Sequence, residues 1–274
     1  MSGPVVVGVD GSQAALEAVR WADLEAIRHR VPLRLVHGCE LAAESKEPVG
    51  VGAARAERGW RWLAEAAAKT GATAELVPAD AVESLVAHSR RARMLVLGSR
   101  GAGLEPAASV ALAVTERASC PVVVVRTPEP GTGRVVVGVD GSAASERALA
   151  FAFAEAALRG ATLRAVHTWS DLLSDRTRLG LDRVRAAEEA SRLLAERLAG
   201  WSSGYPSVTV ERVVEHDRPV RALLRHAARA RLLVVGSRGR EVVGSGMLLG
   251  STSRALVHHS PCPLAVVRPV GASR

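Results

Sequence analysis

Five glycines lie within fifteen positions of the stretch GSRGREVVGSGMLLGSTSR, residues 236–254, which directly follows the apolar run 232–235. Glycine inside a folded element costs roughly 0.5–1 kcal/mol relative to alanine, so a cluster is favourable only where the backbone turns tightly or approaches something closely. Backbone N–H groups that no side chain covers can hold a phosphate. A flexible linker or a plain surface loop would have the same composition, and all three interpretations are open at this point.

An acidic residue occupies a related place in each half of the chain. Asp140 follows the apolar run 135–139 and opens the tripeptide DGS, and Asp10 opens the same tripeptide after the run 5–9. An acid beside a glycine loop and a helix start suits a nucleotide, because free N–H groups and a helix N-terminus together hold phosphates. The same tripeptide is also an ordinary turn with a serine N-cap, and the residues alone favour neither interpretation.

The chain of 274 residues contains an internal repeat. VVVGVDGS occurs at 5–12 and again at 135–142, an offset of 130 residues. MLVLGSRG at 94–101 corresponds to LLVVGSRG at 232–239, and CPVVVV near the end of the first half corresponds to CPLAVV near the end of the second. A repeat of this length predicts two similar domains, because each copy must bury its own core.

We expect domains at 1–127 and 134–270, joined by a linker at 128–133 that is rich in Pro and Gly. Short apolar runs alternate with helical stretches in each half, which implies a parallel sheet with right-handed crossovers and helices on both faces. Each half is therefore predicted to be a five-stranded, doubly wound α/β domain, with strands buried on both faces. In the second half we expect strands at 135–139, 163–167, 208–213, 232–235 and 264–267, and helices at 143–158, 183–198, 219–229 and 251–258.

The polar candidates fall on one rim of the predicted sheet. Ligands of open α/β sheets bind beyond the carboxyl ends of the strands, where the strand order reverses, and Asp140, Thr168 and the glycine loop all follow strand ends. His37 and His167 lie inside apolar strands, and we expect them to be core histidines with satisfied hydrogen bonds rather than catalytic groups.

Composition narrows the classes of partner. With 48% hydrophobic and 23% charged residues the chain is globular, and no apolar stretch reaches the roughly 18 residues of a membrane span. The start lacks the pattern of a signal peptide, so we expect a cytoplasmic protein without a membrane partner.

The net charge is +8, but the arginines are spread along every helix and aromatic residues are only 3%, which argues against nucleic acid. Cys39, Cys120 and Cys262 lack disulfide or metal spacing, so we expect reduced thiols that serve packing.

VVVGVDGS, VVGSRG and the ending SPCPLAVVR, in this order and spacing, resemble the universal stress protein family in its tandem form, over nearly the whole chain. The resemblance implies Rossmann-like domains of the adenine nucleotide alpha hydrolase type. It also implies that the last strands of the two domains pair antiparallel to make a pseudo-dimer within one chain, and that two chains form a homodimer. Such pairing would cover an apolar strand that otherwise invites aggregation at a sheet edge.

In the ATP-binding branch of that family the loop reads G-x2-G-x9-G-[S/T], with an Asp after the first strand near the ribose and phosphates and the adenine at the end of the second strand. The resemblance therefore implies ATP, with or without Mg²⁺, in the second half. The residues that it assigns there are Asp140, Thr168, Gly236, Ser237, Arg238, Gly239, Gly250, Ser251 and Thr252. Ten residues rather than nine separate Gly239 from Gly250, and Gly244 and Gly246 can absorb the extra one.

The first half departs further from this pattern. Its matching residues are Asp10, Gly38, Gly98, Gly101 and Ser109. The loop is three residues shorter up to Ser109, Ala108 stands where the pattern has glycine, and Pro106 removes a backbone donor. We expect the first site to be weak or empty.

Sequence features argue against several functions other than ATP binding. GSGMLLG at 244–250 is similar to a dinucleotide GxGxxG loop, but it follows the fourth strand rather than the first, which argues against an oxidoreductase. No lysine follows Lys69, so a Walker motif is absent. No nucleophile and base pair is apparent, and we expect a regulatory ATP-binding protein rather than an enzyme, with slow incidental hydrolysis at most and an unknown regulatory protein as partner. The alternative is a tandem stress-protein scaffold that binds no nucleotide and acts by association.

Overall fold

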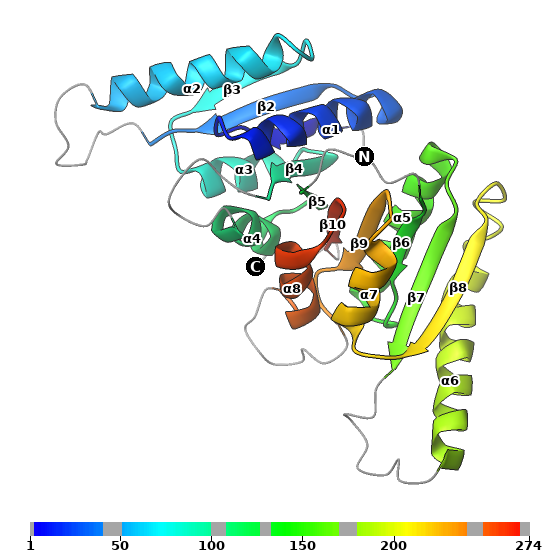
Figure 1. Cartoon of the computed structure of the whole chain (residues 1–274). Helices are drawn as coiled ribbons and strands as arrows, with labels where there is room; N and C mark the ends of the chain where they lie inside the picture. The colour runs from blue at the N-terminus through cyan, green and yellow to red at the C-terminus, as the bar shows by residue number, and fades with distance from the viewer. Residues whose placement is uncertain are drawn as a thin grey trace. The chain divides into compact units, whose positions relative to one another are not determined.

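The computed structural model describes residues 3–40, 51–99, 108–126, 133–169, 180–239 and 249–268. The chain divides into two compact units, Met1–Pro128 and Glu129–Arg274. Of the predicted linker, only Gly133 lies within the described residues. Each unit is built from alternating strands and helices (Figure 1).

The first unit is a five-stranded parallel sheet in the order β3-β2-β1-β4-β5. The helices α1 and α2 lie on one face of this sheet, and α3 and α4 lie on the other (Figure 1). Its elements are β1 (Val5–Gly8), α1 (Gln13–His29), β2 (Leu33–Gly38), α2 (Val51–Ala67), β3 (Thr73–Val77), α3 (Ala81–Ser89), β4 (Met94–Gly98), α4 (Ala108–Arg117) and β5 (Val122–Val125).

The second unit repeats this topology, with the parallel order β8-β7-β6-β9-β10. The predicted five-stranded, doubly wound α/β fold is thus confirmed in both units. The elements are β6 (Val135–Gly138), α5 (Ala143–Arg159), β7 (Leu163–Trp169), α6 (Gly180–Ala199), β8 (Val210–His216), α7 (Pro219–Ala227), β9 (Leu232–Gly236), α8 (Ser251–His259) and β10 (Leu264–Val267).

One predicted strand is wrong in its position and its burial. We expected a strand at 208–213 buried on both faces, but β8 runs from Val210 to His216, and its residues are only partly buried or exposed. The reason is its place at an edge of the sheet, where it pairs with β7. An edge strand is packed less completely than the central strands, so it carries charged side chains without a large desolvation cost.

Matching caps bound the first helix of each unit. Ser12 accepts a hydrogen bond from the backbone N of Ala15, and Ser142 accepts one from that of Ser145, each at 3.1 Å. These bonds satisfy backbone donors that a helix start leaves without partners. Within the part of the chain that the structure describes, no helix is both long and apolar enough to cross a bilayer.

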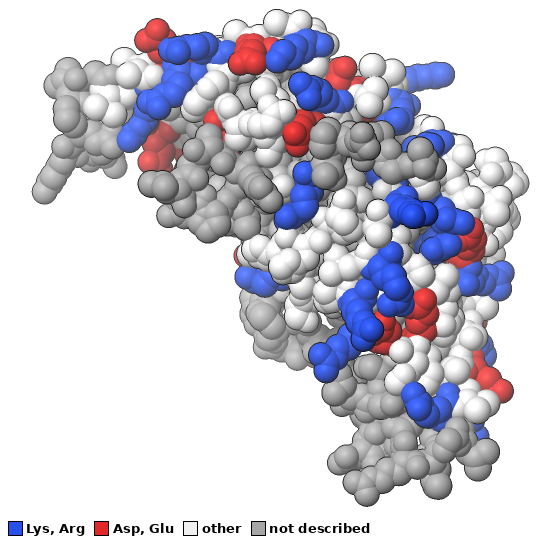
Figure 2. Space-filling model, in the orientation of Figure 1, with Lys and Arg blue, Asp and Glu red and all other residues white. Residues whose placement is uncertain are grey.

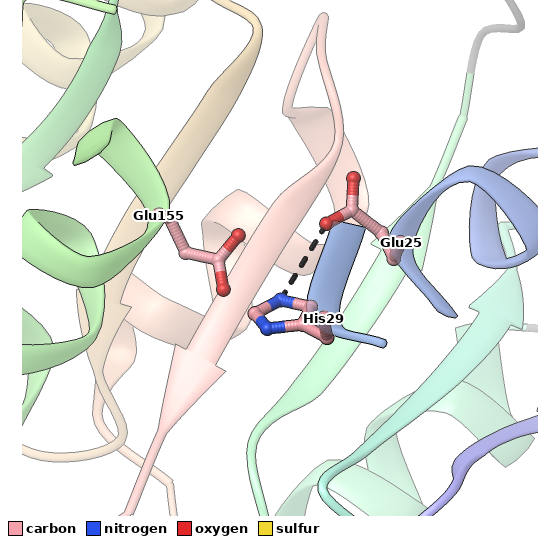
Figure 3. Close-up of side chains that lie close together, drawn as sticks. All are labelled: Glu25, His29 and Glu155. Carbon is pink, nitrogen blue, oxygen red and sulfur yellow. Dashed lines mark ion pairs between the residues drawn. The ribbon is translucent and has the colours of Figure 1, made fainter. Parts of the chain in front are cut away.

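Each unit also buries a glutamate on its first helix, at positions 130 residues apart. Glu25 on α1 is 0% exposed and Glu155 on α5 is 1% exposed. A carboxylate of Glu25 lies 3.7 Å from Nε2 of His29, one turn along the same helix (Figure 3). Glu155 pairs with Arg159 on its own helix. Such partners reduce the cost of burying a charge.

Candidate functional site

The strand order of the second unit reverses between β6 and β9. The strand β6 pairs with β7 on one side and with β9 on the other, and α5 and α7 lie on opposite faces of the sheet. In an open α/β sheet a ligand is expected at such a reversal, between the loops that here follow β6 and β9. Asp140 lies in the first of these loops, and Gly239 lies in the second.

The carboxylate of Asp140 lies against the backbone of Gly239. A Cβ placed on Gly239 would come 2.8 Å from Oδ2 of Asp140, which is too close for an unstrained contact. The other oxygen, Oδ1, accepts a hydrogen bond from the backbone N of Ser142 at 2.9 Å. The Ser142 hydroxyl in turn donates to the carbonyl oxygen of Arg238 at 3.2 Å. The acid, the helix start and the glycine loop are thus joined at one rim.

Gly250 lies at the N-cap of α8, and its backbone N donates to the carbonyl oxygen of Ser237 at 2.8 Å. Its φ of −70° is open to any residue, so the conformation does not require glycine. A Cβ at this position would stand 3.5 Å from Cα of Arg238 and 3.7 Å from the backbone N of Gly239. Those are ordinary contact distances. Glycine at position 250 is therefore not needed for an unusual turn. Its lack of a side chain instead leaves the backbone of Gly239 uncovered.

Among the residues that the structure describes, none caps the start of α8 with its side chain, in contrast to α5, which Ser142 caps. Ser251 and Thr252 are its first two residues. The N–H groups of an uncapped first turn are suited to an anion, which also meets the positive end of the helix dipole. Ser253, which the sequence analysis did not single out, donates its hydroxyl to the carbonyl oxygen of Gly236 at 2.7 Å. This bond holds the first turn of α8 against the end of β9.

The remaining predicted residues of the second unit lie at the same rim with different roles. A Cβ on Gly236 would come 2.8 Å from Ala144, so this glycine allows β9 to pack closely against α5. Ser237 is buried, and its backbone N donates to Val267 at 2.8 Å. Thr168 lies one strand away, near the carboxyl end of β7, and is partly exposed. Gly244 and Gly246, which we expect to absorb the extra loop residue, lie outside the described residues.

The first unit has the same turn but less of the rim within the described residues. Both the backbone N and the hydroxyl of Ser12 donate to Oδ1 of Asp10, at 3.0 and 2.6 Å. Ala108, the counterpart of Gly250, is the first residue of α4, and Ser109 is the second. Gly101 and Pro106 lie outside the described residues, as does the side chain of Ser109.

Two glycines predicted for the first site are used in packing. A Cβ on Gly38 would come 2.6 Å from Cα of Ala81 on α3, and a Cβ on Gly98 would come 2.7 Å from the backbone carbon of Ala14 on α1. Both glycines therefore allow a helix to approach the sheet closely.

The prediction of core histidines is confirmed. Nδ1 of His37 donates to the carbonyl oxygen of Val9 at 2.7 Å, and Nδ1 of His167 donates to that of Val139 at 2.6 Å. Each bond ties the second strand of a unit to the end of its first strand. His167 is buried and His37 is partly buried, and both have a hydrogen-bond partner of the kind that buried polar groups require.

The three cysteines are free and buried, as expected for packing thiols. Burial raises the pKa of the Cys120 thiol to about 12 and that of the Cys262 thiol to about 11. Because the thiolate is the reactive form, these two side chains are not activated nucleophiles.

Comparison with known proteins agrees with this architecture. The sequence profile of the Universal stress protein family matches residues 1–126 and 131–268. The universal stress proteins Rv2005c and Rv2623 of Mycobacterium tuberculosis are 40% and 39% identical to this chain over 287 residues, with 96% of each chain covered.

Solved structures show the same fold. A universal stress protein from Archaeoglobus fulgidus matches 100% of this chain and 98% of its own with a TM-score of 0.71 at 23% identity. A protein from Pseudomonas aeruginosa described as a putative universal stress protein matches 97% of this chain and 92% of its own with a TM-score of 0.59 at 17% identity. The chain belongs to the universal stress protein family and carries two of its domains in tandem.

Proposed function

We propose that this protein is a regulator that binds ATP at the rim of its second unit. The observation that carries the proposal is the meeting of the Asp140 carboxylate with Gly239, beside the uncapped start of α8. In this arrangement a charged acceptor and the backbone N–H groups of a helix start lie at one end of the sheet. A nucleotide offers the complementary groups, hydroxyls on its ribose and oxygens on its phosphates.

The residues divide between the parts of the nucleotide. The N–H groups at the start of α8 and at Gly239 would hold phosphate oxygens, and Ser251 and Thr252 would add hydroxyl donors. Oδ2 of Asp140 would accept from the ribose, because Oδ1 already accepts from Ser142. Thr168 would lie beside the adenine. Mg²⁺, where present, would be held mainly by the phosphates.

The proposed output is binding rather than turnover. Phosphate contacts would order the loop 239–250, and a regulatory protein partner or a homodimer would respond to that ordering. Hydrogen exchange across 239–250 should slow on addition of ATP. Equal exchange with and without ATP would contradict the proposed ordering of the loop, but it would not contradict ATP binding.

The second candidate is a scaffold that binds no nucleotide. The first unit favours it locally, because Ala108 is already helical where the second unit has a glycine cap. If the rim of the second unit is equally unsuited to binding phosphate, the chain acts by association alone.

Calorimetry with ATP and Mg²⁺ separates the two candidates. We expect one ATP per chain, and we expect Gly250→Val to weaken binding about tenfold or more, about 1.4 kcal/mol, because its side chain would cover the amides near Gly239. Gly200→Val is the matched control, since a Cβ there would meet nothing within 4 Å. Absence of heat at millimolar ATP, or equal affinity in Gly250→Val and the wild type, would favour the scaffold.

A further inference from the structure

A hollow of about 220 Å³ lies on the second unit, far along the sheet from the glycine rim. Arg134 comes just before β6, and Arg164 is the second residue of β7. These positions are at the amino ends of the strands, whereas Asp140 follows a carboxyl end. The residues that line the hollow are Arg134, Arg164, Arg225, His226, Ala228, Arg229 and Ala230.

Arg164 is held in place from two sides. Its Nε donates to Glu211 at 2.8 Å, and Glu211 lies directly opposite it in the pairing of β7 with β8. Nη1 of Arg164 donates to Nδ1 of His226 at 3.1 Å, and Nε2 of His226 donates to Glu215 at 3.0 Å. Glu211 also accepts from Nε of Arg134 at 2.9 Å. Two guanidinium groups at the hollow are therefore fixed before any ligand arrives.

Positive charge exceeds negative charge around the hollow. Arg225 pairs with Glu215 and Asp217, and side chains of both signs lie beside each other over α7 and β8 (Figure 2). Arg229 also lines the hollow, and it makes no ion pair with another residue of the described part of the chain. Hydrogen bonds from Arg134 and Arg164 hold the pKa of Glu211 below its usual range. That carboxylate is therefore ionised and already paired with both arginines.

The first unit provides an internal comparison, because the repeat aligns the two edges. Arg34 and His88 correspond to Arg164 and His226, and they share Glu75, at 3.5 and 3.3 Å. Pro4 and Ala87 stand where the second unit has Arg134 and Arg225. The fold therefore forms without arginine at those two positions. The acidic partners of these arginines also belong to the second unit alone, because Thr73, Val77 and Ala79 stand where it has Glu211, Glu215 and Asp217. The second unit thus builds a denser cluster of ion pairs around the hollow.

We propose that this hollow binds a small multivalent oxyanion of the phosphate class. Guanidinium groups offer planar pairs of N–H donors that match phosphate oxygens, and a multivalent anion can engage several of them together. The hollow is smaller than the 300–1,000 Å³ or so of sites for drug-sized ligands, which suits an anion of the size of pyrophosphate.

Inorganic pyrophosphate is the probe, titrated into the full chain by calorimetry. We expect Arg134→Ala/Arg225→Ala to weaken binding on the order of tenfold, as for the loss of charge-assisted hydrogen bonds. The matched control is Arg192→Ala/Arg212→Ala, which removes the same charge from α6 and β8 outside the hollow. Arg229→Gln tests the hollow without disturbing an ion pair, and circular dichroism reports whether each variant folds.

Pyrophosphate could also occupy the phosphate site of a nucleotide. The experiment must therefore distinguish binding at the hollow from binding at the glycine rim. We expect Gly250→Val to keep its affinity for pyrophosphate, so that this inference holds or fails apart from ATP binding. The proposal is overturned if Gly250→Val abolishes pyrophosphate binding, if the hollow variants bind like the control, or if the wild type shows no binding at millimolar pyrophosphate.

Discussion

Asp140 and Gly239 meet across 99 positions of sequence, because the two neighbouring strands they follow carry the chain in the same direction. The absence of a side chain on Gly239 lets its backbone approach Oδ2 of Asp140, where a Cβ would stand only 2.8 Å away. The other carboxylate oxygen is committed to Ser142. One oxygen is therefore structural, and the second lies against Gly239. This division of roles predicts which change at Asp140 affects binding without affecting the fold.

Asp140→Asn should weaken ATP binding roughly tenfold to a hundredfold while preserving the turn. Asparagine keeps the shape and an oxygen that can accept from Ser142, but it replaces the charged acceptor. A hydrogen bond to a charged group contributes about 1.5–3 kcal/mol, so its loss falls in this range. Calorimetry of the variant with ATP gives the affinity, and thermal unfolding without ATP reports on the fold.

Asp10→Asn is the control, because Asp10 forms the same turn in the first unit through two hydrogen bonds from Ser12. We expect it to leave ATP affinity unchanged and the stoichiometry at one per chain. Equal losses in both variants would mean that both rims bind, and no loss in Asp140→Asn would exclude the assigned role of its carboxylate.

The thiols of Cys120 and Cys262 should resist alkylation in the folded protein. Burial favours their neutral form and raises their pKa values to about 12 and about 11. This raised pKa stabilises the fold below the unfolded value of about 8.5, and the contribution is lost as the pH rises through the folded values. The free energy of unfolding should therefore decline between about pH 9 and pH 11.

The measurement is alkylation by iodoacetamide at about pH 8.5, with a Cys39→Ala background so that only these two thiols remain. We expect slow labelling in the folded protein and full labelling in urea. Labelling of the folded protein at the rate of a free thiol would contradict the effect of burial.

The central parts of the fold could be predicted because their apolar runs are nearly continuous. The expected strand 264–267 coincides with β10, and the expected helix start at 251 coincides with that of α8. The expected strand 208–213 was misplaced, because β8 lies at an edge and carries Glu211, Arg212 and Glu215. Charged side chains at an exposed edge interrupt the pattern of apolar residues from which strands are predicted.

The site could be predicted in outline only. Asp140 was placed at the rim because it follows the first strand of its unit. The bond from Ser142 to the carbonyl of Arg238 spans 96 residues, and the contact of Gly236 with Ala144 depends on helix packing, so neither could be read from spacing. The pairing of the two last strands and the homodimer stay predictions.

Ser142 and Ser12 form a matched pair that tests whether the turn of the second unit acts on its glycine loop. Each serine caps its helix, so Ser142→Ala and Ser12→Ala should each cost about 1 kcal/mol of unfolding free energy in their own unit. Only Ser142 donates to Arg238, whereas the Ser12 hydroxyl donates to Asp10. Urea unfolding should therefore show similar losses, while hydrogen exchange near Arg238 and ATP affinity should change only in Ser142→Ala. If Ser12→Ala lowered ATP affinity as much, the effect would come from general destabilisation, because Ser12 lies in the other unit and contacts a different loop.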